Sequence, residues 1–144
     1  MISCDFIKGA LRWEQEPDNP TIVVEGINST NVTLSWTYSL DPGATLQGVV
    51  FERTSRENFL KRTSLLSRLP NQEFRYLKDE FVKEYRANLP SRLVLLDVNN
   101  DEEYMYSVVV QYNDMSMVLY HVSAPMTAII VQGKYQKQLN IFFS

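Results

Sequence analysis

The sequence predicts an all-β protein in which two antiparallel sheets pack face to face as a sandwich. In Asn31-Val-Thr-Leu-Ser-Trp36, apolar side chains alternate with polar ones, which is the period of a half-buried strand. The alternation returns in Leu93-Val-Leu-Leu-Asp-Val98 and again from Tyr104 to Val110. A tryptophan on an early strand and tyrosines that open a late strand are typical of a two-sheet sandwich.

Length and composition agree with one globular domain. The 144 residues can bury a core without disulfide bonds, and the apolar share of 44% is ordinary. The net charge of −3 comes from acids and bases that are scattered along the chain, which argues against a nucleic-acid surface. The single cysteine, Cys4, excludes an intrachain disulfide and is expected to be a free thiol, with an intermolecular bridge as the alternative.

The first half of the chain contains three expected strands. A short β-branched run covers Thr21–Val24, and the strongest strand pattern covers Asn31–Tyr38. Asp41-Pro-Gly43 predicts a turn, because proline presets one φ angle and glycine accepts a positive one. The next strand is expected over Leu46–Arg53.

The middle of the chain carries two competing patterns. Phe74, Leu77, Phe81 and Tyr85 recur at helical spacing, whereas alternation from Phe81 to Leu89 indicates a strand. We expect a strand near Tyr85–Leu89 with a helical turn before it, and Pro90 ends the run.

The second half completes the sandwich. Asn113-Asp114 predicts a turn, Met115–Val122 and Thr127–Gln132 predict the closing strands, and Ser123-Ala-Pro125 predicts a kink between them. The residues expected to form the core are Val32, Leu34, Trp36, Leu93, Leu95, Tyr104, Tyr106 and Val108.

These motifs resemble the immunoglobulin V-set pattern. Val32-Thr-Leu34 is similar to its strand B motif, and Leu93–Val98 followed by Asp101 and Tyr104 is similar to its E–F region. With Trp13, Pro20 and Glu25-Gly26, the chain looks most like the cysteine-poor immunoglobulin-like domains of cnidarian cell-surface proteins. The resemblance implies an immunoglobulin-like domain over 13–132, a leader or incomplete N-terminus over 1–12, and a linker or unusual tail over 133–144.

The chain departs from the V-set pattern where the family has its disulfide. Trp36 stands where the strand B cysteine belongs, and either Tyr106 or Val108 stands at the strand F cysteine position. The usual strand C tryptophan is absent, with Val50 or Phe51 nearby, so Trp36 and Tyr106 are expected to fill the volume that the disulfide and tryptophan fill elsewhere.

Fibronectin type III is the alternative resemblance. Its Ser-Val-Thr-Leu-Ser-Trp motif is similar to Asn31–Trp36, and Val98 and Tyr104 have the spacing of its tyrosine corner. The stretch from Arg53 to Val98 is too long for that family, and Tyr85–Leu89 looks like an added V-set strand D. We therefore favour the immunoglobulin-like fold.

Catalytic and metal-binding chemistry is poorly represented. His121 is the one histidine, and no nucleophile motif accompanies it, so we expect no enzyme. One histidine and one cysteine cannot form a closed zinc site. The carboxylates of Asp97, Asp101, Glu102 and Glu103 are expected to form a solvated turn rather than a calcium site. No cofactor, metal, nucleic acid or small-molecule substrate is expected.

Two sequons favour an extracellular location. Asn28-Ser-Thr30 and Asn31-Val-Thr33 are glycosylation candidates, and Asn31 lies on the outward side of its strand. No transmembrane span is apparent. Asp5 and Lys8 interrupt the apolar start, so no signal peptide is expected there and any membrane attachment lies in parts absent from this chain.

Two functions fit this pattern. The first is an extracellular recognition or adhesion module of a cell-surface protein, which binds a protein partner through the face of the sheet with strands C, F and G. The resemblance implies homophilic binding as one form of this. The alternative is a spacer domain, immunoglobulin-like or fibronectin-like, without a ligand of its own.

The partner-binding candidates are Glu52, Met105, Ser107, Gln111 and Tyr112. Met115, Met117 and Tyr120 are further interface types, although a core role is equally expected for Met117 and Tyr120.

Overall fold

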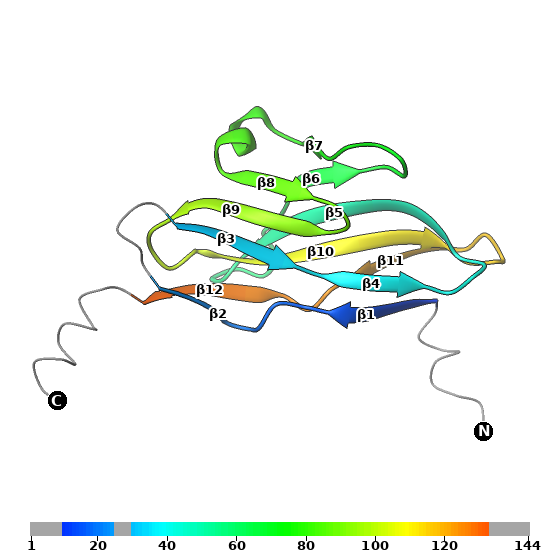
Figure 1. Cartoon of the computed structure of the whole chain (residues 1–144), viewed down its shortest axis with the longest axis horizontal. Helices are drawn as coiled ribbons and strands as arrows, with labels where there is room; N and C mark the ends of the chain where they lie inside the picture. Colours follow the sequence, from blue (N-terminus) through cyan, green and yellow to red (C-terminus); the bar gives the residue numbers. More distant parts are fainter. Residues whose placement is uncertain (1–9, 25–29, 133–144) are drawn as a thin grey trace, which may run out of the picture.

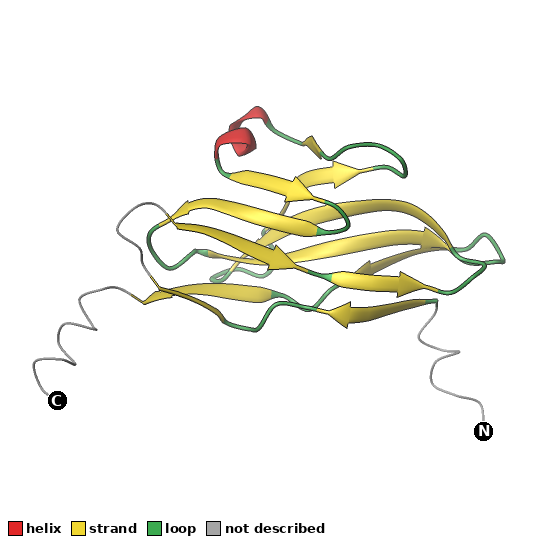
Figure 2. Cartoon of the chain, in the orientation of Figure 1, coloured by secondary structure: helices red, strands yellow, loops and turns green. Residues whose placement is uncertain are grey.

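The fold is an immunoglobulin-like β-sandwich, as the sequence predicts. It is described from a computed structural model, of which residues 10–24 and 30–132 are considered (Figure 1). In chain order the elements are β1 (Leu11–Gln15), β2 (Thr21–Val24), β3 (Thr30–Ser35), β4 (Thr37–Leu40), β5 (Thr45–Ser55), β6 (Arg62–Arg68), β7 (Arg75–Tyr76), the 3₁₀ helix η1 (Asp79–Lys83), β8 (Tyr85–Asn88), β9 (Arg92–Val98), β10 (Tyr104–Asn113), β11 (Leu119–Ser123) and β12 (Thr127–Gln132). Figure 2 shows that strands dominate the described part of the chain.

The strands form two main layers and a short ribbon. The larger sheet has the order β2-β12-β10-β5-β6-β7, with β11 also paired to β10. The smaller sheet has the order β3-β9-β8, and β1 pairs with β4. All pairings are antiparallel except that of β2 with β12. A D strand beside the E strand, with extra strands beyond C, is the variable-type immunoglobulin arrangement.

The long segment after Arg53 explains why the variable-type pattern fits better than fibronectin type III. It builds β6 and β7 at one edge of the larger sheet and β8 at the edge of the smaller one. The helical spacing of Phe74 to Tyr85 yields only the single turn of η1, followed by β8. The expected strand near Tyr85 with a helical turn before it is therefore what the structure contains.

Trp36 lies at the centre of the core. Its side chain is fully buried, and its ring lies 6.2 Å from that of Phe51 on β5. The indole Nε1–H donates to the carbonyl of Pro125 at 3.2 Å. Six of the other residues expected in the core are also buried, namely Val32, Leu34, Leu93, Leu95, Tyr106 and Val108. Tyr104 differs, because it is only partly buried and packs against the edge of the core.

A hydrogen bond at the start of β10 indicates which residue replaces the strand F cysteine. The hydroxyl of Tyr106 donates to the Glu102 carboxylate, four residues upstream, at 3.2 Å. In immunoglobulin domains, a tyrosine whose hydroxyl bonds back to the upstream backbone stands two residues before the cysteine position. Tyr106 bonds back to a side chain instead, and by this likeness Val108 corresponds to the cysteine position. It lies opposite Phe51 in the ladder, and its carbonyl accepts from Ala124 N, next to the Pro125 carbonyl that Trp36 bonds.

One strand was not expected, and one expected strand boundary differs from the structure. The unexpected strand is β1, which begins at the buried residue Leu11. The strand expected over Met115–Val122 begins only at Leu119. The residues before it form a turn, because Met117 has a positive φ of 64° and the Asp114 side chain binds backbone N–H groups there.

Candidate functional site

Two of the five partner-binding candidates are buried, and the prediction for them was wrong. Ser107 is 4% exposed, and its hydroxyl donates to the carbonyl of Ala124 at 2.6 Å. Tyr112 is 0% exposed and faces the interior, where its hydroxyl accepts from Ala10 N at 3.1 Å. The ladder between β10 and β5 shifts register between Gln111 and Tyr112. Tyr112 also has the opposite parity to Ser107, so the two side chains lie on opposite faces of the sheet.

The other three candidates, Glu52, Met105 and Gln111, lie on the outward face of the larger sheet and are half-buried. Glu52 forms an ion pair with Arg62 at 2.7 Å. The Gln111 side chain lies over Gly48, because a Cβ at Gly48 would stand 3.1 Å from its Oε1. Of these three side chains, the Glu52 carboxylate therefore already has an ionic partner within the domain.

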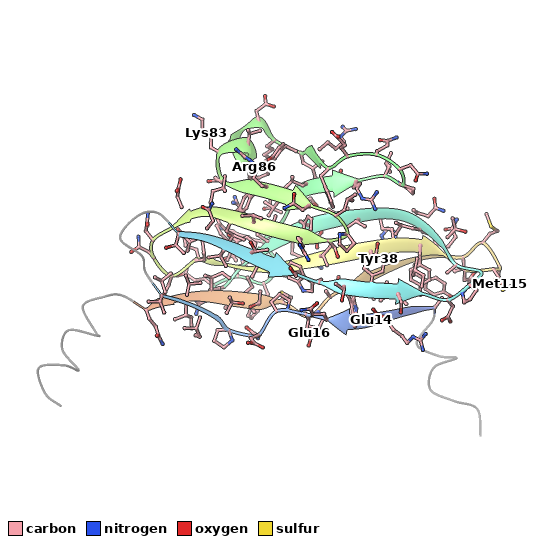
Figure 3. The ribbon with its side chains drawn as sticks, in the orientation of Figure 1. Glu14, Glu16, Tyr38, Lys83, Arg86 and Met115 are labelled. Atoms are coloured by element: carbon pink, nitrogen blue, oxygen red, sulfur yellow. The ribbon has the colours of Figure 1, made fainter. Side chains whose placement is uncertain are left out.

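A more exposed apolar surface lies at the turn between β10 and β11. We call it the tip patch, and it consists of Met115, Met117, Val118, Leu119 and Tyr120, all exposed. Met115 is 85% exposed and Met117 is 75% exposed. Figure 3 shows Met115 at one end of the molecule, far from Lys83 and Arg86. Six consecutive positions with only one serine among them, and this much free apolar surface, are the strongest signal for an interaction site on the described residues.

Asp114 fixes the turn that carries the tip patch. Its Oδ1 accepts hydrogen bonds from the amides of Ser116 and Val118, at 2.9 and 3.0 Å. Its Oδ2 accepts from the hydroxyl of Tyr120 at 3.0 Å. These bonds favour the charged carboxylate, and the one from Val118 contributes most to lowering the pKa of Asp114 below its ordinary value. The hydrogen bond to Asp114 also raises the pKa of Tyr120.

The tip patch rests on rigid neighbours. The Tyr120 ring stacks on that of buried Tyr112, with 5.2 Å between centroids and an interplanar angle of 18°. Met115 lies against the turn between β4 and β5, where a Cβ at Gly43 would approach its Cγ to 2.4 Å. With glycine at position 43, the Met115 side chain can lie this close to the turn. The exposed side chains are presented on a turn that is supported from both sides.

The opposite end of the sandwich contains a cluster of polar and aromatic groups around Arg53. The guanidinium lies over the Tyr104 ring at 4.2 Å and the Phe81 ring at 5.1 Å. It donates to the hydroxyl of Tyr85 at 3.0 Å, and that hydroxyl lies 3.1 Å from the hydroxyl of Tyr106. Because Arg53 and Tyr106 belong to the larger sheet and Tyr85 to the smaller one, the cluster joins the two layers.

Burial sets the protonation of this cluster. It raises the pKa of the Tyr106 hydroxyl well above its ordinary value, so this group stays protonated and donates to Glu102. Burial also raises the pKa of the Glu102 carboxyl, against the hydrogen bond from Tyr106 and the charge of Arg53. A cleft of about 320 Å³ beside the cluster is lined by Arg53, Glu84, Tyr85, Leu95, Leu96, Glu102, Glu103 and Tyr104. The groups that line it mostly bond one another, which indicates a structural role.

The remaining chemistry-bearing residues are dispersed. Among residues 10–24 and 30–132, no three His, Cys, Asp or Glu side chains gather as a metal site would require. His121 is exposed on β11.

A polar crevice of about 510 Å³ runs between β3 and the segment that joins β1 to β2, lined in part by Glu16 and Asp18. The described part of the chain has no helix long and apolar enough to cross a membrane.

The two glycosylation candidates and the cysteine have different outcomes. Asn31 is exposed on β3, and its Oδ1 accepts from Asp97 N at 3.3 Å. Asn28 and Cys4 lie outside the described residues, as does the expected linker over 133–144.

The sequence pattern missed Val118 and Leu119 as surface residues, because Met115–Val122 has the composition of a strand. One signal in the sequence could have indicated a turn. The turn-forming pair Asn113-Asp114 stands just before the run, and the four residues after Ser116 do not alternate with polar residues as a half-buried strand would.

Comparison with known proteins relates the chain to others by fold alone. No protein-family model matches it, and no curated protein sequence matches it. A structure of murine CRIg aligns with a TM-score of 0.66 at 10% identity, over 86% of this chain and 99% of that one. A chain from a structural study of T cell specificity and activation by the bacterial superantigen toxic shock syndrome toxin-1 aligns with a TM-score of 0.63 at 14% identity, over 86% and 100%. This chain therefore shares the immunoglobulin-like fold of these structures.

Proposed function

We propose that this domain is an extracellular recognition module that binds a protein partner through the tip patch and the adjoining outward face of the larger sheet. The observation that carries the proposal is the tip patch itself. Its apolar side chains are exposed, while the turn beneath them is held by three hydrogen bonds to Asp114 and by the stacking of Tyr120 on Tyr112. A site that is already ordered loses little conformational entropy on binding.

The composition of the tip patch suits a protein partner. Methionine and tyrosine are enriched at protein interfaces, and methionine adapts its shape to an irregular apolar surface. The two clefts described above, beside the Arg53 cluster and beside β3, lie elsewhere on the domain and are lined largely by polar groups.

Neighbouring structures and the sequence pattern support recognition rather than catalysis. The second similar chain comes from a study of T cell specificity and activation by a bacterial superantigen. In this chain the single histidine is exposed, and no nucleophile or metal cluster accompanies it among the described residues. We propose that the domain is not an enzyme and that it needs no cofactor.

Substitution of the two exposed methionines tests the proposal. Tetramers of the domain carrying Met115→Glu and Met117→Glu should lose binding to the surface of source cells at least tenfold relative to wild type. The expected reason is that two charges would be desolvated at the contact. Thermal melts should coincide, because both side chains are exposed.

Leu60 provides the matched control. It is 92% exposed and lies in the turn between β5 and β6, at the other end of these strands. Leu60→Glu adds the same charge to an equally exposed apolar residue and should leave binding unchanged. Loss of binding only in Leu60→Glu would move the site to that end. A wild-type domain that binds no cell surface would leave the spacer function.

Glycan attachment at Asn31 tests the extracellular location. When the chain is expressed through a secretory pathway, Asn31→Gln should remove one glycan and increase electrophoretic mobility. The exposed position of Asn31 on β3 supports this expectation. An unchanged mobility, also after glycosidase treatment, would argue against modification at this residue.

A further inference from the structure

The outer edge of β11 has no strand partner among the described residues. β11 pairs with β10 on one side through the register from Asn113–Leu119 to Val109–Ser123. On its other side, no strand of residues 10–24 or 30–132 is paired with it. β2 pairs with the outer edge of the next strand, β12, from Ile129 to Gln132. This pairing begins only after the kink that follows β11, so it does not cover the edge of β11.

The hydrogen bonds that flank β11 show which backbone groups face outward. Asp114 N donates to Val118 O, and Ala124 N donates to Val108 O. These two bonds fix the alternation of an antiparallel ladder, in which every second pair exchanges hydrogen bonds. Tyr120 and Val122 therefore direct their amide groups toward β10. Leu119, His121 and Ser123 direct theirs away, to the open edge.

The open edge lacks the features that usually prevent strand pairing. Protein sheets protect their edges with lysine, proline, bulges or covering segments. From Leu119 to Ser123 there is no lysine, other full charge or proline, and the pairing to β10 continues without a shift. Four of the five residues are exposed, and Val122 is half-buried. Among the described residues, neither a covering segment nor a charged side chain therefore prevents another strand from pairing with this edge.

We infer that β11 pairs with β11 of a second copy of this chain, antiparallel and about a two-fold axis through His121. This inference rests on the proposed function and deepens it. It names a second copy of this chain as the partner that binds at the end of the molecule with the tip patch. In this register the outward groups of Leu119, His121 and Ser123 meet those of Ser123, His121 and Leu119 of the second copy. Every outward amide and carbonyl of the strand then has a partner.

The side chains in this register are also self-complementary. Tyr120 of one copy lies opposite Val122 of the other, an aromatic and β-branched pair of the kind that stabilises sheets. Val118 and Met117 of the tip patch continue toward Ala124 and Pro125 of the other copy. No charged side chain faces a like charge along the edge, which is the electrostatic condition for two identical edges to meet. A strongly charged strand from another protein finds no opposite charge here.

A charge-swap experiment tests the pairing, because position 121 faces itself only in this dimer. Sedimentation of the wild-type chain from about 10 µM to 1 mM, the range of weak association, should show reversible dimers. His121→Lys and His121→Glu should each be monomeric, since like charges directly opposite one another destabilise a sheet. An equal mixture of the two variants should restore dimers.

His121→Ala is the matched control. It keeps the outward backbone groups and adds no charge, so it should still dimerise, within about threefold of the wild-type dissociation constant. Thermal melts of all three variants should match wild type because His121 is exposed. A monomeric wild type, dimers in both charged variants, or a mixture that stays monomeric would each overturn the inference. If the β11 pairing fails but the Met115→Glu, Met117→Glu variant still loses cell binding, the proposed function stands and only the β11 pairing is overturned.

Discussion

At the scale of single residues, the two positions of the usual disulfide are filled by apolar packing. Trp36 and Val108 are both fully buried, and the carbonyls of Pro125 and Val108 tie both residues to the kink between β11 and β12. A disulfide contributes about 2–4 kcal/mol through its effect on the unfolded chain. A fully buried tryptophan stabilises the folded state by a comparable amount through area removed from water.

Trp36→Ala should therefore reduce the free energy of unfolding by about 3–5 kcal/mol, because it removes the largest fully buried side chain. Urea melts followed by circular dichroism measure this loss. Trp36→Phe is the matched variant, which keeps an aromatic ring beside Phe51 but loses the hydrogen bond to Pro125, so its cost should be smaller. Equal melts for Trp36→Ala and wild type would mean that Trp36 carries no part of the core energy.

At the scale of elements, strands were predictable and turns with special side-chain bonds were not. Val32, Leu34 and Trp36 share one parity, and a register error of one residue would expose all three, so the sequence pattern determines β3 strongly. The run from Met115 to Leu119 has an equally apolar composition. Its conformation depends on the hydrogen bonds of Asp114, which alternation does not encode.

The same limit applies to the candidate site. Parity placed Met105 and Gln111 correctly on the outward face, where both are partly exposed. Tyr112 was assigned to that face despite its opposite parity, and it is buried. The surface position of Met117 and Tyr120 follows from the turn, so a pattern that predicts a strand there cannot distinguish surface from core.

Removal of the Asp114 side chain should loosen the tip patch without unfolding the domain. In Asp114→Ala, the amides of Ser116 and Val118 lose their acceptor, so both should exchange with solvent deuterium at least tenfold faster than in wild type. Asp114→Asn is the matched variant: it retains an oxygen acceptor for both amides and should exchange at an intermediate rate. Amide exchange measured by NMR decides this, and unchanged rates in Asp114→Ala would show that other contacts hold the turn.

At the scale of the whole molecule, the two sheets are joined at one end by a polar cluster and elsewhere by apolar packing. Arg53 and Tyr106 approach from the larger sheet, and Tyr85 approaches from the smaller one. Phe81 of η1 adds a ring under the guanidinium. The segment with ambiguous periodicity thus supplies the side chains that close this end, and their role depends on Arg53, which is far away in the sequence.

This cluster makes stability depend on pH in a direction that can be derived. Burial raises the pKa of Glu102 in the folded protein above its value in the unfolded chain. Between these two values the folded state binds more protons, so the free energy of unfolding decreases as pH rises. The contribution is fully present below the ordinary carboxyl pKa, about 4.3, and is lost as pH passes the raised value.

Glu102→Gln should remove this dependence and keep an acceptor for the hydroxyl of Tyr106. The variant should gain stability relative to wild type as pH rises from about 4, and the difference should become constant once Glu102 is fully ionised in wild type. Urea melts at a series of pH values up to 8 measure the difference directly. Glu103→Gln, at the exposed neighbouring residue, removes the same formal charge and should show a smaller change across this range. A stability difference between Glu102→Gln and wild type that does not vary with pH would contradict this prediction. It would mean that Glu102 is as well solvated in the folded domain as in the unfolded chain, and that the cluster around Arg53 is open to water.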